Sequence, residues 1–216
     1  MMNINHYNAD NTKKYLENLP KVESVGEINI SNRIIESISL IYKSTGRLVV
    51  QRLNVEDSPA LFDFYFSGLS EESRSYFPPY PLFSPPVNSA EELSIRITDW
   101  KEEDDWTVLK LSRDERIIGI CLLKRYKTER PTSGLAVREE FQQIGLGFLL
   151  QTIINEQARL LDLKKLYVTL AQDNIDSLHV HKKCGFKQTD RLVPHYGYRN
   201  GEKVIDRQDI EMVIEF

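Results

Sequence analysis

The sequence predicts a fold of the α/β (α+β) class, in which helices flank a mixed sheet. From Leu48 onward, short apolar runs that suit strands alternate with amphipathic stretches that suit helices. A turn with two glycines at 145–147 opens the longest helical pattern, which continues to Leu161. Near the C-terminus, Asn200-Gly201 separates two strand patterns and predicts a hairpin. Strands and helices mixed in this way form layers around one sheet.

The first 46 residues are predicted to form an N-terminal arm, mainly helical. Its beginning is polar, and Gly46 suits the end of a helix. Four isoleucines recur in the arm at roughly helical spacing: Ile30, Ile34, Ile38 and Ile41. We expect the arm to pack against the main domain, and a dimer or substrate contact is the alternative.

The next segment predicts a strand and three helices. A strand at 48–53 precedes Ser58-Pro59, a pair typical of a helix start, and Ser70 can cap a second helix. Five prolines in 77–86 exclude a helix and predict an extended loop. A third helix then begins with a Ser-x-x-Glu capping box and carries an apolar stripe; these residues are Ser89, Glu92, Leu93, Ile97 and Trp100.

The second half of the chain alternates strands with two helices. Strands are predicted at 106–112 and 116–126, joined by a polar turn at 113–115, and again at 131–137 and 166–171. The remaining elements are the long helix from Gly145, a helix from Asn174 to Gly185, and a hairpin of 187–198 with 204–215. The core side of the long helix is predicted to carry Leu146, Leu149, Leu150, Ile153, Ile154, Ala158 and Leu161.

Composition excludes several functional classes. The chain has 216 residues, a net charge of −4 and a pI near 5.7, so it lacks the basic footprint of a nucleic-acid-binding protein. No apolar run reaches the ~18 residues that span a bilayer, and the start lacks the apolar core of a signal peptide. Its only cysteines, Cys121 and Cys184, form neither a disulfide framework nor a metal cluster. We expect a cytoplasmic protein without metal, as a monomer or homodimer.

The segment from Val137 to Gly147 carries the clearest chemical signal. A strand ends, a short turn follows, and Gly145 and Gly147 open a helix. The amides of a first helical turn have no partners inside the helix and lie at the positive end of its dipole. Glycine lets a phosphate approach these amides without a Cβ in the way. The segment therefore predicts an anion-binding turn.

Two common nucleotide motifs do not fit this turn. A P-loop requires a Gly-Lys-Ser/Thr sequence, which does not follow. The dinucleotide fingerprint requires a third glycine, and that position holds Leu150. Packing of glycines at a helix start remains the alternative interpretation.

Two motifs resemble those of the GCN5-related N-acetyltransferases (GNAT). Gln142, Gly145 and Gly147 match the cofactor motif Gln/Arg-x-x-Gly-x-Gly/Ala. The stretch from Asn174 to Phe186 resembles the second motif, Asn-x-x-Ala-x-x-x-Tyr-x-x-x-Gly-Phe. The opening strand with its paired helices and the closing hairpin are also similar, so the resemblance covers residues 47–216.

The resemblance implies a mostly antiparallel central sheet that splays between its fourth and fifth strands, at 133–137 and 166–171. It implies acetyl-CoA as co-substrate and a primary amine, of a small molecule or a protein, as acceptor. The implied cofactor-binding residues are Leu135, Ala136, Val137, Gln142, Gln143, Ile144, Gly145, Leu146, Gly147, Asn174 and Ser177. In this family the amine attacks the bound thioester directly, without a covalent enzyme intermediate.

The implied catalytic groups depart from the family pattern. His181 occupies the position of the family's tyrosine acid, and an imidazolium can also donate a proton. Tyr167, Tyr196 and Tyr198 are the alternatives for this role. Where many relatives carry a glutamate base this chain has Thr132, which leaves Glu129, Glu72 or a water chain as candidates. Cys184 precedes the glycine that ends its helix and is expected to pack rather than to act as a nucleophile.

Because the acid and base positions are altered, a non-catalytic acyl-CoA-binding or sensor domain of the same fold is the main alternative function. A protein-interaction module that uses the N-terminal arm and the aromatic loop is a third. The acceptor side is expected at residues 70–86, where Tyr76, Phe77 and Tyr80 are candidates to line an amine pocket.

Overall fold

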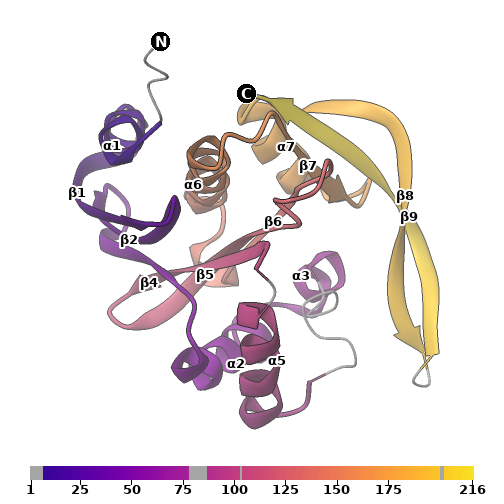
Figure 1. Ribbon diagram of the computed structural model, residues 1–216. Helices are drawn as coiled ribbons and strands as arrows, with labels where there is room; N and C mark the ends of the chain where they lie inside the picture. Colours follow the sequence, from indigo (N-terminus) through magenta and orange to yellow (C-terminus); the bar gives the residue numbers. More distant parts are fainter. Residues whose placement is uncertain (1–6, 78–86, 103, 200–201) are drawn as a thin grey trace.

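The structure is a computed structural model that describes residues 7–77, 87–102, 104–199 and 202–216. Within these residues, nine strands form one sheet in the order β1-β2-β3-β4-β5-β6-β7-β9-β8 (Figure 1). The strands are β1 (Val22–Ser31), β2 (Ile34–Tyr42), β3 (Gly46–Arg52), β4 (Trp106–Arg113), β5 (Arg116–Lys124), β6 (Thr132–Val137), β7 (Lys165–Leu170), β8 (Lys187–Arg199) and β9 (Glu202–Glu215). The helices are α1 (Ala9–Glu17), α2 (Ser58–Phe66), α3 (Glu71–Tyr76), α5 (Ala90–Glu102), α6 (Leu146–Leu160) and α7 (Ile175–Lys183), with short 3-10 helices η1 (Val55–Asp57) and η2 (Glu139–Phe141).

The predicted fold class is confirmed. All neighbouring strands pair antiparallel except β6 and β7, which are parallel. The predicted starts of α2, α3, α5, α6 and α7 lie within one or two residues of the observed ones. The predicted 77–86 loop and the Asn200-Gly201 turn fall almost entirely outside the described residues. No described helix is long and apolar enough to cross a membrane.

The helical prediction for the second half of the N-terminal arm is wrong. Residues 22–42 form the β1–β2 hairpin, which continues the main sheet because β2 pairs with β3. Asn32 and Arg33 both have positive φ, of 48° and 67°, as a two-residue hairpin turn requires. Ile34 and Ile38 lie on one face of β2, because residues four apart share a strand face, while Ile30 lies on β1 across the turn. The segment is also rich in β-branched isoleucine, which favours strands. Among the arm residues that the structure describes, from 7 onward, only α1 is helical, and the Asn8 side chain caps it.

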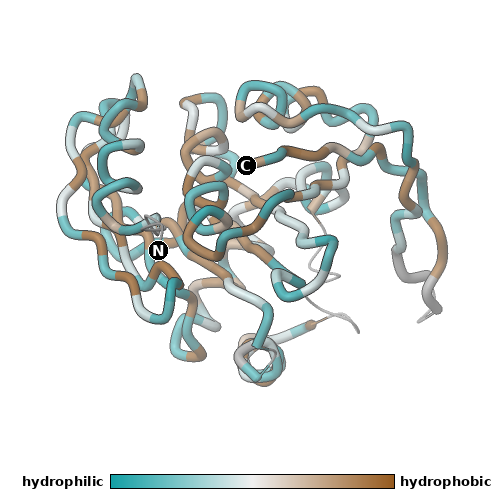
Figure 2. Tube along the Cα trace, turned by 45° about the horizontal axis from the view of Figure 1, so that its top comes forward, coloured by the Kyte–Doolittle hydropathy of each residue, from teal (hydrophilic) through white to brown (hydrophobic). Residues whose placement is uncertain are grey.

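The sheet is covered on both faces. On one face α1, α6 and the β1–β2 hairpin share a core, and on the other α2 and α5 form a second core. β5 is buried on both sides, since Cys121 and Leu123 face the first core while Ile120 and Leu122 face the second. Figure 2 shows the apolar residues gathered in the middle of the molecule. Burial on both faces fixes β5 in the sheet. Six residues of β6 pair with β5, so β6 is held in place as well.

A glycine in the left-handed backbone region ends α7. Gly185 has φ of +94° and directly follows the C-cap residue Cys184. Its amide donates to the Lys182 carbonyl, and the Phe186 amide donates to the His181 carbonyl, both at 3.0 Å. This paired arrangement satisfies the last carbonyls of the helix. It also brings the Phe186 ring edge-on against the His181 ring, with 5.3 Å between centroids.

Candidate active site

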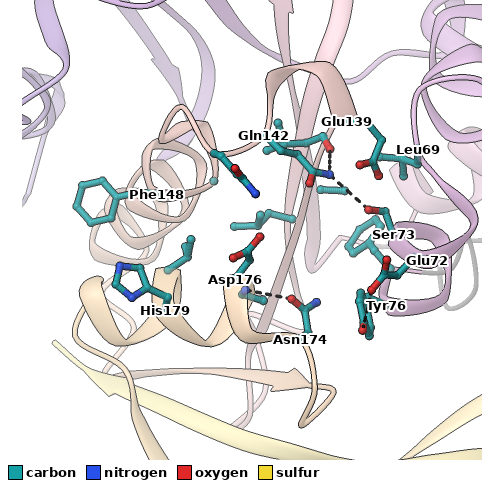
Figure 3. Close-up of a pocket in the computed structure, with 18 of the residues that line it drawn as sticks. Leu69, Glu72, Ser73, Tyr76, Glu139, Gln142, Phe148, Asn174, Asp176 and His179 are labelled. Atoms are coloured by element: carbon teal, nitrogen blue, oxygen red, sulfur yellow. Dashed lines mark hydrogen bonds between the residues drawn. The ribbon is translucent and has the colours of Figure 1, made fainter.

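A cavity of about 510 Å³ lies beside β6, with α3 on one side and α6 and α7 on the other (Figure 3). Figure 3 shows Phe148 and His179 on one flank and Glu72, Ser73 and Tyr76 on the opposite flank. The lining comprises Leu69, Ser70, Glu72, Ser73, Tyr76, Phe77, Leu135, Ala136, Val137, Glu139, Gln142, Gln143, Gly145, Gly147, Phe148, Asn174, Asp176, Ser177, His179, Val180 and Lys183.

Most of the predicted site residues meet at this cavity. Nine of the eleven implied cofactor-binding residues line it: Leu135, Ala136, Val137, Gln142, Gln143, Gly145, Gly147, Asn174 and Ser177. Ile144 and Leu146 are absent from the lining, because both side chains pack against the α6 core. His181 and Glu129 are also absent from it.

The turn before α6 has the geometry of an anion-binding turn. Gln143 and Gly145 adopt positive φ angles of 59° and 96°, and Gly145 is the N-cap of α6. A backbone whose φ angles alternate in sign directs neighbouring N–H groups to one side, and the start of the helix adds the positive end of its dipole. The Gln142 side chain braces the turn by donating to the Val137 carbonyl at 3.0 Å.

Gly147 and Gly145 serve this turn in different ways. A Cβ on Gly147 would lie 3.6 Å from Val180 and 3.8 Å from Leu135, so the protein itself has room for it. A Cβ on Gly145 would lie 2.7 Å from the Tyr42 hydroxyl oxygen, and its φ of +96° is unfavourable for other residues. Gly145 is therefore required by the backbone, whereas Gly147 leaves space within the cavity.

The edge of β6 that faces β7 is largely unpaired. Among the described residues the only ladder pair between these strands is Thr132 with Tyr167. Beyond Thr132 the backbone groups of 133–137 on this edge have no strand partner, while the other edge is fully paired with β5. Backbone polar groups held open in this way are available to an extended polar ligand, as in β-strand addition.

The start of α7 forms the wall opposite α3. The Asn174 side chain caps the helix by accepting from the Ser177 amide at 3.1 Å, and both residues line the cavity. The cap fixes the Asn174 side chain at the wall of the cavity. In this position Asn174 can cap the helix and contact a ligand at the same time.

The structure places His181 in the core, a position that does not fit the predicted role of proton donor. Its side chain is 1% exposed. Nδ1 is hydrogen-bonded to the Ser177 carbonyl at 2.7 Å, and Nε2 lies 3.1 Å from the Gln151 side-chain amide. Burial lowers the pKa of His181 to about 4, so the imidazole is neutral near pH 7. His181 therefore supports α7 and α6 from beneath the cavity.

The other predicted proton carriers lie mostly outside the cavity. Glu129 is exposed in the turn that precedes β6. Tyr167 packs beneath the Arg130 guanidinium at 4.3 Å, and Tyr196 is 43% exposed on β8. The side chain of Tyr198 lies outside the described residues. Of the base candidates, Glu72 alone lines the cavity, and its carboxylate accepts from the Tyr76 hydroxyl at 3.3 Å.

Two further carboxylates line the cavity, Glu139 and Asp176, and the sequence analysis did not single them out. Partial burial of Glu139 opposes ionisation, but hydrogen bonds from Ser73 and Ser70 bring its pKa below the ordinary value. Both carboxylates stand within three residues of a motif residue, Gln142 or Asn174, which is the signal that would have found them.

The two flanks of the cavity carry side chains of opposite charge. Together with Glu72, these carboxylates give an acidic region from α3 to the start of α7. Lys183 lies at the other flank, with its ammonium 4.7 Å from the Phe148 ring centroid. One flank thus favours an anion and the other a cation.

Sequence comparison identifies the class of protein that this fold and cavity define. The family model described as "Acetyltransferase (GNAT) domain" matches residues 47–187. The chain therefore belongs to the GNAT acetyltransferase family. The comparison with curated protein sequences found no match.

Solved structures share the fold at low sequence identity. The GNAT domain of PAT from S. lividans is 16% identical with a TM-score of 0.63, over 83% of this chain and 97% of that one. Spermidine N-acetyltransferase from Vibrio cholerae, in complex with CoA and spermine, is 18% identical with a TM-score of 0.60, over 78% and 95%. RimL, a ribosomal L7/L12 alpha-N-protein acetyltransferase in complex with CoA, is 18% identical with a TM-score of 0.62, over 78% and 93%.

Proposed function

We propose that this protein is an acetyl-CoA-dependent N-acetyltransferase that acetylates a primary amine by direct attack in a ternary complex. The observation that carries the proposal is the meeting of two features in one cavity. The anion-binding turn at 142–147 opens beside the unpaired edge of β6, so groups suited to a pyrophosphate adjoin groups suited to an extended amide chain. Family membership and the CoA complexes of the related folds support the same function.

The residues present fit CoA. Amides of 143–147 would hold the pyrophosphate, the β6 edge around Leu135 and Val137 would pair with the pantetheine arm, and Asn174 would border that arm. Bound acetyl-CoA supplies an activated acetyl group and a thiol leaving group. The free N–H groups of β6 can polarise the acetyl carbonyl, and orientation of the two substrates supplies much of the remaining rate enhancement.

The acidic flank suits the acceptor. An alkyl amine, with a pKa of about 10, and a protein N-terminus, with a pKa of about 8, are both mostly ammonium ions near pH 7, and either must lose a proton before it attacks. Glu72 stands at this flank with Tyr76 and Phe77, so we assign it to binding the ammonium and accepting its proton. A polyamine and a protein N-terminus both present such a cation, as in the relatives named for those substrates.

The proposal is tested by thiol release from acetyl-CoA with a panel of primary amines, comparing Glu72→Gln with Glu71→Gln. Glu71 is the matched control because it is an exposed neighbour on α3 that does not line the cavity. For Glu72→Gln we expect kcat/KM for the amine to fall about 10- to 100-fold at pH 7 with an unchanged Kd for CoA. For alkyl amines the loss should shrink above about pH 10, where the amine is already neutral.

Two outcomes would contradict this assignment. Equal activity of the two variants would remove Glu72 from proton transfer. Tight CoA binding without thiol release for any amine would instead favour the non-catalytic acyl-CoA-binding function, for which the buried His181 is the supporting observation.

A further inference from the structure

The N-terminal extension reaches the anion-binding turn. Lys21 precedes β1 and Tyr42 ends β2, so both lie outside residues 47–187 that match the family. The Lys21 ammonium donates to the Ile144 carbonyl at 2.8 Å, and the Tyr42 hydroxyl donates to the same oxygen at 3.2 Å. One carbonyl in the middle of the turn therefore has two donors from the extension.

These two bonds determine where the next amide points. A trans peptide is planar, with its C=O and N–H directed to opposite sides. Because the Ile144 carbonyl is held toward Lys21 and Tyr42, the Gly145 N–H must point away from them. Gly145 lines the cavity while Ile144 does not, which agrees with this orientation. The extension thus aims an amide of the turn into the cavity.

The Tyr42 side chain is buried, whereas the Lys21 side chain is exposed and only its backbone is anchored. Tyr42 is 3% exposed, and burial raises its pKa to about 12, so its hydroxyl stays protonated and can donate. The backbone of Lys21 is fixed by the Lys43 amide, which donates to the Lys21 carbonyl at 2.9 Å. The turn needs such support, since Gln143 holds a positive φ of 59° that is unfavourable for a residue with a side chain.

We propose that Lys21 and Tyr42 are positioning residues for phosphate binding, which make the N-terminal extension a working part of the cofactor site. They hold the Ile144–Gly145 peptide with its N–H toward the cavity, and the Lys21 ammonium adds positive charge beside the turn. This inference rests on the proposed CoA-dependent function.

The test compares Lys21→Met with Lys43→Met by calorimetry. Lys43 is a matched control, because it is an exposed lysine directly after β2 whose ammonium donates to the Pro20 carbonyl at 2.7 Å and not to Ile144. Its main-chain amide, which anchors Lys21, is kept in the methionine variant. Both variants lose one positive charge. We expect Lys21→Met to raise the Kd of CoA about three- to tenfold, and Lys43→Met to change it less than twofold. Lys21→Arg should restore most of the affinity.

A ligand without phosphate separates positioning from general destabilisation. S-acetylpantetheine carries the thioester arm without the pyrophosphate, so its Kd should be the same in wild type and Lys21→Met. Tyr42→Phe keeps the buried ring and removes one donor; it should raise the Kd of CoA about two- to threefold and likewise leave S-acetylpantetheine unaffected.

The outcomes distinguish the two proposals. If wild type does not bind CoA, the proposed function fails. If wild type binds CoA and Lys21→Met binds it equally well, or if the variants weaken CoA and S-acetylpantetheine alike, the positioning role is overturned while the proposed function stands.

Discussion

Replacement of Gly147 by leucine is the sharpest test of the anion-binding turn. The position is in the first turn of α6, and its Cβ would meet Val180 and Leu135 only at 3.6 and 3.8 Å, which are ordinary contact distances. Helical side chains point back toward the N-terminus, so the rest of the leucine would extend toward the amides of the turn. The substitution should fill the phosphate site while the fold accommodates it.

The magnitude follows from the bonds that would be lost. Hydrogen bonds to a charged group contribute about 1.5–3 kcal/mol each, so blocking one or two of them should weaken CoA binding by about 3 kcal/mol, or a hundredfold or more in Kd. Leucine is a better helix former than glycine by up to ~0.8 kcal/mol, so Tm should be unchanged or higher. Affinity and stability should therefore change in different directions.

Calorimetry of CoA binding together with thermal melts checks this prediction, and Gly147→Ala serves as a graded control with a smaller loss of affinity. Gly145 is unsuitable for the same test, because its φ of +96° and the Tyr42 hydroxyl make any side chain there a change to the backbone. Unchanged CoA affinity in Gly147→Leu would refute the assignment of the turn. A fall in Tm that parallels the loss of affinity would refute the claim that the fold has room.

Two further predictions concern α7. Because burial lowers the folded-state pKa of His181 from 6.5 to about 4, the unfolded chain binds this proton more readily, and His181 should cost the fold up to about 3 kcal/mol of stability as pH falls through that window. Denaturant unfolding at several pH values should show that the free energy of unfolding falls less steeply with decreasing pH in His181→Gln than in wild type. Equal slopes for the two proteins would contradict the buried neutral imidazole. Burial raises the pKa of the Cys184 thiol to about 12, so Cys184→Ala should keep most of its activity; an acetyl-thioester trapped on Cys184 by mass spectrometry would disprove this.

The sequence determined the features that depend on neighbouring residues. The Ser70 side chain caps α3, and Gly185 ends α7, because the groups that interact lie within a few residues of each other. The turn at 142–147 belongs to the same class, since a positive φ and a missing Cβ are properties of single positions. The cofactor-binding residues that the family resemblance implied remain a prediction, and nine of these eleven residues line one cavity.

Only the tertiary structure decided which side chains reach the cavity. The four isoleucines were compatible with strands as well as with a helix, and pairing of β2 with β1 and β3 selected strands. His181 occupies the motif position of an acid, yet α6 packs over it and supplies Gln151 as its partner. Lys21 lies more than a hundred residues from Ile144 in sequence, so no local pattern predicts their contact. Packing between distant segments sets burial, and burial decides whether a side chain serves the core or the site.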